Sequence, residues 1–319
     1  MAAEIERRGV RAGPERSAGP RHKEITRSLL EHALGMAAEF EAAAIFVYVE
    51  GLPREHWQVP ERFRTTFYFV AKTDEEAERI EQAGMNVIRA PNVRLTRMGQ
   101  VKLAILLALA QGLLEPGDVI LCLAGITHSG TLDTLVVMEV GSEFELFMAP
   151  SGQEVKSPEI RPEVLVRVID IALDLSAEGR EGKPVGALFV IGDAERVQAL
   201  SRQLILNPFH GYPPEQRNVL DARLVETIKE LSTIDGAFVI RGDGEIVSAG
   251  TYLMTHALPA EELPPGLGAR HQAAAGITAV TDAIAVAVSE STGTVTVFRQ
   301  GRPIIQIERG HRSKSAAEW

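Results

Sequence analysis

Apolar and polar positions follow two periods along the first half of the chain. Residues 22–40 space their apolar side chains as an amphipathic helix does, whereas 44–49 are apolar almost throughout, as in a buried strand. Further strands are expected at 65–71, 85–89, 119–123 and 134–140, and further helices at 73–83, capped by Thr73, and at 100–113. Strands that alternate with helices predict an α/β unit with a largely parallel sheet.

A segment rich in turn-forming residues, 149–158, separates this unit from a second α/β pattern. The second pattern predicts helices at 162–175, 194–200 and 219–231, a helix beginning at 268, strands at 185–191, 237–241, 245–250 and 284–288, and an irregular stretch at 205–214. We therefore expect two α/β domains, 22–150 and 157–309, between tails at 1–21 and 310–319. Their separate hydrophobic patterns predict independent cores, the second around a mixed sheet.

Composition and charge narrow the possible partners. The chain has 319 residues, 45% hydrophobic content and a net charge of −10, which suits two buried cores and opposes binding to nucleic acid. No apolar run approaches the eighteen or so residues of a membrane span, so we expect no membrane partner. The single cysteine, Cys122, lies in an apolar run and predicts a buried thiol in a reducing, cytoplasmic setting rather than a reactive one.

Two Asp-Gly pairs have different surroundings. Asp243 and Gly244 have a predicted strand on each side, which is typical of a hairpin turn. Asp235 and Gly236 follow a helix instead. This context leaves Asp235 free to point at a ligand and lets Gly236 admit a ligand close to the backbone, although a helix-to-strand turn without chemistry is the alternative.

About thirty residues later, Gly268 and Ala269 precede Arg270 and His271 at the start of a small-residue helix. A helix N-terminus favours a phosphate through its free N–H groups and its dipole, and two basic side chains would extend that site. A solvated basic pair on the surface is the alternative. Asp235 is a hard oxygen ligand of the kind that holds Mg²⁺ or Mn²⁺ against phosphate oxygens. Together these residues predict phosphoryl-transfer chemistry.

The same residues carry a resemblance to a known family. The blocks 234–240, 268–274, 281–283 and 288–290 resemble, in order and spacing, the diadenylate cyclase domain, which condenses two ATP into cyclic di-AMP. The resemblance covers roughly residues 157–309. The family commonly has Gly-Thr-Arg-His-Arg where this chain has Ala269 in place of the threonine and Gln272 in place of the last arginine.

The resemblance implies a mechanism and a set of site residues. A 3′-hydroxyl of one ATP attacks the α-phosphorus of the other, twice, with loss of two pyrophosphates. Asp235 would bind Mn²⁺ or Mg²⁺, and Arg270 and His271 would hold phosphate oxygens. The nucleotide-binding set implied by the family is Gly236, Ala237, Leu253, Gly268, Ala269, Arg270, His271, Gln272, Ser289 and Glu290. Ser289 and Glu290 could instead cap a turn that leads into Gly293.

The reaction also implies a homo-oligomer, because one pocket that holds one ATP cannot complete a two-nucleotide condensation. Active sites of two protomers must face each other. The acidic surface suggests no large apolar interface near the site, so we expect a pairing that is at least partly transient. A non-catalytic module that senses ATP or cyclic di-AMP is the alternative function, and Gln272 in place of arginine is its best support.

The first unit has a weaker resemblance. Residues 114–120, followed by a turn rich in Gly and Thr, resemble the C-terminal domain of pyruvate kinase, and its position before the cyclase-like region resembles the archaeal-type arrangement of diadenylate cyclases. The turn contains Gly125, Thr127, His128, Ser129, Gly130 and Thr131 and follows a strand, the usual place for a ligand in an open α/β sheet. It is either an effector site for a small anion or a polar connection.

Two other nucleotide or metal motifs are excluded. Residues 179–184 have the spacing of the start of a phosphate-binding loop, but Pro184 occupies the position of the required hydroxyl. The eight histidines are scattered without a pair at ligand spacing, so no zinc centre is expected.

Overall fold

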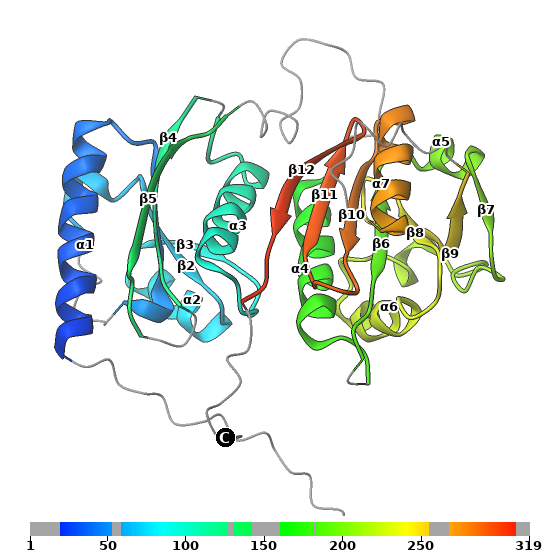
Figure 1. The fold of residues 1–319 in the computed structure, drawn as a ribbon, viewed down its shortest axis with the longest axis horizontal. Helices are drawn as coiled ribbons and strands as arrows, with labels where there is room; N and C mark the ends of the chain where they lie inside the picture. The colour runs from blue at the N-terminus through cyan, green and yellow to red at the C-terminus, as the bar shows by residue number, and fades with distance from the viewer. Residues whose placement is uncertain are drawn as a thin grey trace, which may run out of the picture.

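The structure is a computed structural model that describes residues 20–52, 59–115, 117–126, 130–141, 160–181, 183–254 and 268–310. Two sheets, each with its own helices, lie beside one another (Figure 1). The predicted linker at 149–158 and nearly all of both predicted tails lie outside the described residues. The α/β class is confirmed, and the domain bounds stay predictions.

The N-terminal unit contains α1 (Pro20–Glu39), β1 (Ala44–Tyr48), β2 (Phe67–Ala71), α2 (Asp74–Gln82), β3 (Asn86–Arg89), α3 (Arg97–Ala110), β4 (Val119–Ala124) and β5 (Thr134–Glu139). Its five strands form one sheet in the order β3-β2-β1-β4-β5, in which only β5 runs antiparallel to its neighbour. The predicted, largely parallel sheet is therefore confirmed. Thr73 caps α2 as predicted by accepting a hydrogen bond from the Glu76 amide at 3.3 Å.

The C-terminal unit contains α4 (Pro162–Glu178), β6 (Ala187–Ile191), α5 (Ala194–Ala199), β7 (Ser201–Gln203), α6 (Val225–Leu231), β8 (Ala237–Ile240), β9 (Ile246–Leu253), α7 (Ala269–Val280), β10 (Ile284–Val288), β11 (Val295–Arg299) and β12 (Arg302–Ile307). Its seven strands form one sheet in the order β12-β11-β10-β6-β8-β9-β7. Within this sheet only β6 and β8 pair in parallel, so the predicted mixed sheet is confirmed.

Helices cover both faces of this second sheet. In β6, Phe189 and Ile191 belong to the apolar cluster that contains α4, whereas Leu188 and Val190 belong to the cluster that contains α7. Because successive strand residues point to opposite faces, continuous apolar runs such as β6 and β10 are required wherever both faces are buried.

Helix α3 is buried nearly all round, because it packs against the N-terminal sheet on one side and against β12 and α4 on the other (Figure 1). A helix that is apolar on every face needs such double burial. The buried residues of both units consequently form one connected cluster that runs from β1 through α3 to α4 and β12. The expectation of two independent cores is therefore wrong, since apolar contact continues across this interface.

The helix predicted at 219–231 is shorter than expected. Residues 222–224 form a single 3-10 turn, and α6 begins only at Val225. Asn218 and Asp221 each accept a hydrogen bond from a backbone N–H two residues ahead, at 3.0 and 2.9 Å. Such side chains compete with the helical backbone and favour turns, which explains the late start.

Local features at two other positions agree with the sequence. The Asp243–Gly244 turn joins β8 and β9 as an antiparallel hairpin, with Gly244 at φ +95°. Cys122 is fully buried, and burial raises the pKa of its thiol to about 12, so it is the structural thiol expected.

Within the described ranges, none of the helices combines the length and apolar character that crossing a membrane would require.

Candidate active site

A cavity of about 670 Å³ opens at the end of the second sheet where α7 and β11 begin and β10 ends. Four of the predicted site residues at the helix start, and both residues of the Ser-Glu pair, contribute to its wall. The described residues that line it are Pro184, Gly268, Ala269, Arg270, His271, Val288, Ser289, Glu290, Ser291, Thr292, Thr294, Thr296 and Gln306.

Arg270 lies between two carboxylates at the mouth of this cavity. Its Nη2 is 3.4 Å from Asp235 Oδ1 and its Nη1 is 3.4 Å from Glu290 Oε2. The side chain of Asp235 is 91% exposed and that of Glu290 is 61% exposed, so water screens both pairs. Contacts of this kind contribute little free energy, which leaves the guanidinium free to exchange a carboxylate for a phosphate oxygen.

Gly186 makes room for the guanidinium and was not identified from the sequence. A Cβ at this position would lie 2.7 Å from Arg270 Nη1 and 3.2 Å from Glu290 Cβ. Glycine therefore lets Arg270 lie in its present position between both carboxylates, and a larger residue would displace the guanidinium. The available signal was a glycine directly before a buried strand, which often marks a close approach to the backbone.

His271 is buried, with 6% of its surface exposed, and its ring meets the edge of Phe298 at a centroid distance of 5.8 Å. Burial lowers the pKa of His271, because the apolar surroundings disfavour the charged form. His271 is therefore neutral at pH 7 and offers a hydrogen bond rather than a positive charge. The pair at the helix start supplies one cation, Arg270, instead of two.

The backbone at the start of α7 adds donors. Gly268 is the N-cap and has no side chain to accept from the first-turn N–H groups. The amides of His271 and Gln272 bond back to the Gly268 carbonyl, at 3.0 and 3.1 Å. The Ala269 and Arg270 amides belong to the first turn, where helical geometry provides no internal acceptor. An anion in the cavity can therefore use these groups.

Ser289 and Glu290 follow β10 in the turn that closes onto β11. The Ser289 amide donates to the Thr294 carbonyl at 2.9 Å, and the Ser289 hydroxyl accepts from the Thr292 amide at 3.3 Å. Ser289 therefore caps the turn, and it also lines the cavity, so that nucleotide binding by Ser289 and Glu290 stays a prediction. The hydroxyl-bearing wall made by Ser291, Thr292, Thr294 and Thr296 was not identified from the sequence.

Gly236 has a structural reason of its own to be glycine. Its φ is +109°, and a Cβ there would lie 2.6 Å from both Gly250 C and Thr251 N. The backbone of β9 therefore approaches Gly236 closely, and the expected approach of a ligand to Gly236 stays a prediction. Gly236 makes the sharp entry into β8 that leaves Asp235 exposed beside Arg270.

Three other predicted nucleotide residues lie outside the cavity wall formed by the described chain. Ala237 is fully buried and pairs with Thr251 in the sheet, and Leu253 is buried in the same apolar cluster. Gln272 is exposed on α7 and does not line the cavity. The structure therefore brings Asp235, Arg270, His271, Ser289 and Glu290 together but does not place these three with them.

The donors available for a metal are few. Within the described parts of the chain, no three His, Cys, Asp or Glu side chains gather as a metal-binding group. Asp235 is one exposed carboxylate, 3.4 Å from Nη2 of Arg270, and Arg270 lines the cavity. A single protein carboxylate fits Mg²⁺ or Mn²⁺, which commonly complete their coordination with substrate phosphates and water. The residues present therefore fit a metal that arrives with a nucleotide.

Comparison of the sequence with known proteins shows the family of the chain. Residues 174–303 match the family model described as "DisA bacterial checkpoint controller nucleotide-binding". The diadenylate cyclase of Haloferax volcanii is 39% identical over 209 residues, which cover 63% of this chain and 72% of that protein. This chain belongs to the diadenylate cyclase family. The diadenylate cyclase of Methanocaldococcus jannaschii is 38% identical over 208 residues, and the match spans 63% of that relative's length.

The N-terminal region matches a model of its own. Residues 26–148 fit the family described as "Probable sensor domain DacZ_P". The structure of a pyruvate kinase from Cryptosporidium parvum is 15% identical to this chain. The match covers 36% of this chain and 23% of the pyruvate kinase, with a TM-score of 0.29. That likeness is too loose to carry an argument, so the resemblance to the pyruvate kinase C-terminal domain is not confirmed.

Another solved structure resembles this chain only loosely. The structure of DacA from Staphylococcus aureus is 23% identical, and the match covers 47% of this chain and 87% of that chain with a TM-score of 0.31. The fold assignment therefore rests on the sheet order and helices described above.

Proposed function

We propose that this chain condenses two ATP into cyclic di-AMP and two pyrophosphates. Each half-reaction forms a bond between a 3′-oxygen and an α-phosphorus, breaks the bond from that phosphorus to pyrophosphate, and releases the proton of the 3′-hydroxyl. The observation that carries the proposal is Arg270, held between two exposed carboxylates at the mouth of a cavity whose wall includes a helix N-terminus.

Phosphate binding by Arg270 follows from its weak pairing. The guanidinium would leave Asp235 and Glu290 and form charge-assisted hydrogen bonds with phosphate oxygens beside the first-turn amides of α7. His271, neutral at pH 7, would donate or accept one further hydrogen bond. These groups position the phosphates and stabilise the charge that builds up in the transition state.

Asp235 would then hold the divalent metal on which diadenylate cyclases generally depend, and we propose Mn²⁺ or Mg²⁺. Release of Arg270 to the phosphates frees the Asp235 carboxylate for this role. When bound, such an ion neutralises phosphate charge and lowers the pKa of a hydroxyl group beside it. Ser289 and Glu290 line the same cavity, and we propose that they contact the nucleotide there.

The condensation needs two nucleotides, so we propose that two protomers pair with their cavities facing each other. Exposed apolar side chains support self-association: Leu204 and Leu206 follow β7, and Tyr252 and Met254 lie in or just after β9, its partner strand. Asp235 precedes β8, on the other side of β9. This set provides more exposed apolar surface on the second unit than the sequence led us to expect.

The matched test uses Arg270→Ala and Arg223→Ala in the full chain. Arg223 also pairs with a carboxylate, Asp221 at 2.7 Å, but its side chain is 85% exposed and does not line the cavity. We expect Arg270→Ala to lose product formation by about a hundredfold and Arg223→Ala to keep it. Equal activity of the two variants would contradict the proposal. If the parent chain binds ATP but forms no product, the sensor alternative is supported instead.

Pairing is tested by mixing. Active protein with an excess of Asp235→Asn should lose specific activity through mixed pairs, whereas the same excess of Arg223→Ala should not depress it. Specific activity that depends only on the amount of active protein would contradict pairing of the cavities.

A further inference from the structure

One helix of the N-terminal unit contacts a strand that lines the candidate active-site cavity. Lys102 on α3 donates from Nζ to the Gln306 backbone carbonyl in β12 at 3.0 Å. Gln306 pairs with Thr296 of β11, and both residues line the cavity. Lys102 is therefore one residue removed from the candidate active site, although it lies about two hundred positions earlier in the chain.

The contact lies at an outer strand of the sheet. β12 is the last strand on its side, so its outer backbone groups need partners from elsewhere, and Lys102 supplies one for the Gln306 carbonyl. Just after β12, the Thr96 amide donates to Glu308 O at 3.1 Å, and the Gly310 amide donates to Arg94 O at 2.9 Å. The end of β12 is thus tied to the N-terminal unit.

Close packing makes this junction sensitive to small movements of α3. A Cβ at Gly99 would lie 2.7 Å from Glu308 O, so the first turn of the helix touches the strand backbone directly. On the other side of the strand end, Arg309 donates from Nη1 to Ser176 O, and Ser176 donates in turn to Gly293 O. Gly293 belongs to the cavity-lining turn after β10.

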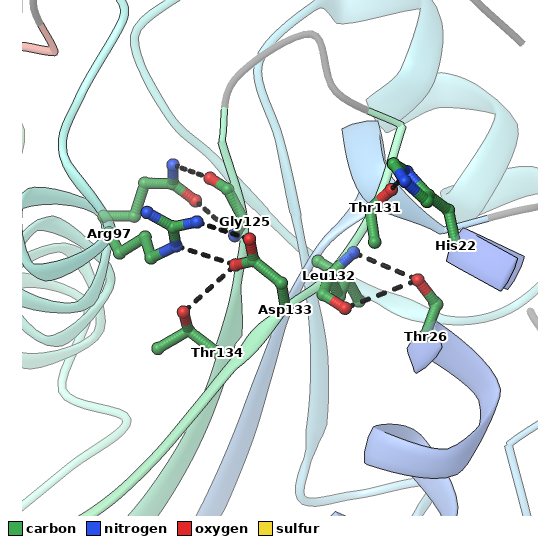
Figure 2. Close-up of polar contacts among 9 residues, drawn as sticks. His22, Thr26, Arg97, Gly125, Thr131, Leu132, Asp133 and Thr134 are labelled. Carbon is green, nitrogen blue, oxygen red and sulfur yellow. Dashed lines mark hydrogen bonds and ion pairs between the residues drawn. The ribbon is translucent and has the colours of Figure 1, made fainter. Parts of the chain in front are cut away.

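The same helix also holds the carboxyl end of the N-terminal sheet. The side chain of Gln100 donates from Nε2 to Gly125 O at 2.7 Å. Arg97 forms a bidentate ion pair with Asp133, with Nε 2.7 Å from Oδ1 (Figure 2). From α1, Thr26 binds both backbone groups of Leu132 (Figure 2). Gly125 begins the turn considered from the sequence as an effector site, and residues 127–129 of that turn lie outside the described chain.

We propose that α3 couples the N-terminal unit to the nucleotide cavity, with Lys102 as a positioning residue for Gln306. A shift of α3 would move β12, the strand that carries Gln306. Gln306 offers an amide donor and an acceptor to the nucleotide. The inference rests on the proposed function, because it concerns how that same cavity binds ATP.

The test compares Lys102→Met with Lys102→Arg in the full chain, by titration of ATP binding and by steady-state kinetics. Lys102→Met keeps the apolar stem but removes the charge and the donor, so we expect the Kd and the KM for ATP to rise by about threefold to tenfold, with a smaller change in kcat. Lys102→Arg retains a donor and should stay within about twofold of the parent. Arg79→Met, which removes an exposed pair with Glu75 on α2, is the control and should change neither constant.

A double-variant cycle separates positioning from general stability. Because Lys102 is proposed to act through Gln306, Lys102→Met combined with Gln306→Ala should weaken ATP binding no more than the worse single variant. Additive effects, or an unchanged Kd in Lys102→Met, would overturn the inference. If Lys102→Met does not fold, Lys102→Gln is measured in the same way.

Two outcomes keep this inference distinct from the proposed function. If the parent chain binds ATP but makes no product, the Kd measurements still decide the role of Lys102. If the parent makes product and Lys102→Met binds ATP normally, only the coupling fails.

Discussion

Replacement of Gly186 by alanine tests whether the position of Arg270 matters for chemistry. The new Cβ would lie 2.7 Å from Arg270 Nη1 and 3.1 Å from its Cζ, so the guanidinium must move. The displaced atoms are the far end of a flexible side chain, and the fold need not change. A charge-assisted hydrogen bond contributes about 1.5–3 kcal/mol, so kcat/KM for ATP should fall by about 10- to 150-fold.

Stability should move little, or in the opposite direction. Gly186 has no positive φ, and alanine at an unstrained position commonly stabilises by about 0.4–1 kcal/mol because it restricts the unfolded chain. We therefore expect a melting temperature within about 3 °C of the parent. Gly35→Ala is the matched control: its Cβ would meet nothing within 4 Å in α1, so activity should stay unchanged.

The assay is the initial rate of product formation over a range of ATP concentrations, beside a thermal melt. If the Gly186→Ala variant keeps the kcat/KM and the melting temperature of the parent, Arg270 works equally well from another position, and its present position does not matter for catalysis. Loss of activity with a large drop in melting temperature would also count against it, because the prediction requires an intact fold.

Three further outcomes follow from the structure. Burial, together with the charge of Asp174, raises the pKa of Asp170 to about 6 from its ordinary 3.8, so the carboxylate of Asp170 destabilises the fold once the pH has risen through 6. Asp170→Asn should therefore stabilise the chain by about 1 kcal/mol at pH 8, a figure reduced because the Asp170 side chain is 36% exposed. Denaturant unfolding should show no such gain at pH 4. Burial lowers the pKa of His271, so its contribution to stability is present above the ordinary histidine pKa and decreases as pH falls below it; His271→Gln should flatten the pH dependence of unfolding between pH 7 and 5. Gln272→Arg should change the KM for ATP by less than about twofold, because Gln272 does not line the cavity, and a larger drop in KM would place its side chain against the nucleotide.

Features that depend on neighbouring residues could be predicted from the sequence. The hairpin at Asp243 and Gly244 and the helix start at Gly268 follow from local backbone preferences, and both are confirmed. The alternation of strands and helices gave the class of each sheet, because periodicity reports which faces are buried.

Features that depend on distant contacts could not be predicted in this way. Gly186 and Gly236 are both glycines before strands, but one makes room for Arg270 and the other for the backbone of β9. A sequence alone does not say which group approaches a glycine. His271 looked like a second cation until its burial against Phe298 was known. The three-residue strand β7 has too few positions for a pattern to be recognised.

The strongly apolar sequence of α3 carried a signal that was interpreted too narrowly. Leu103 to Leu109 are nearly all fully buried, which requires partners on every side of the helix. That pattern predicts contact with a second layer, and β12 and α4 supply it. The expectation of independent cores treated α3 as part of one unit only.

Cyclic di-AMP synthesis is measured by incubating the purified full chain with ATP and Mn²⁺ or Mg²⁺ and following cyclic di-AMP by mass spectrometry and pyrophosphate by a coupled assay. We expect one cyclic di-AMP for every two pyrophosphates released, and a loss of about a hundredfold or more in Asp235→Asn with an unchanged melting temperature. The Asp235 side chain is 91% exposed, so its replacement should not change the fold. ATP consumption without cyclic product, or full activity in Asp235→Asn, would show that the chain is not the proposed cyclase.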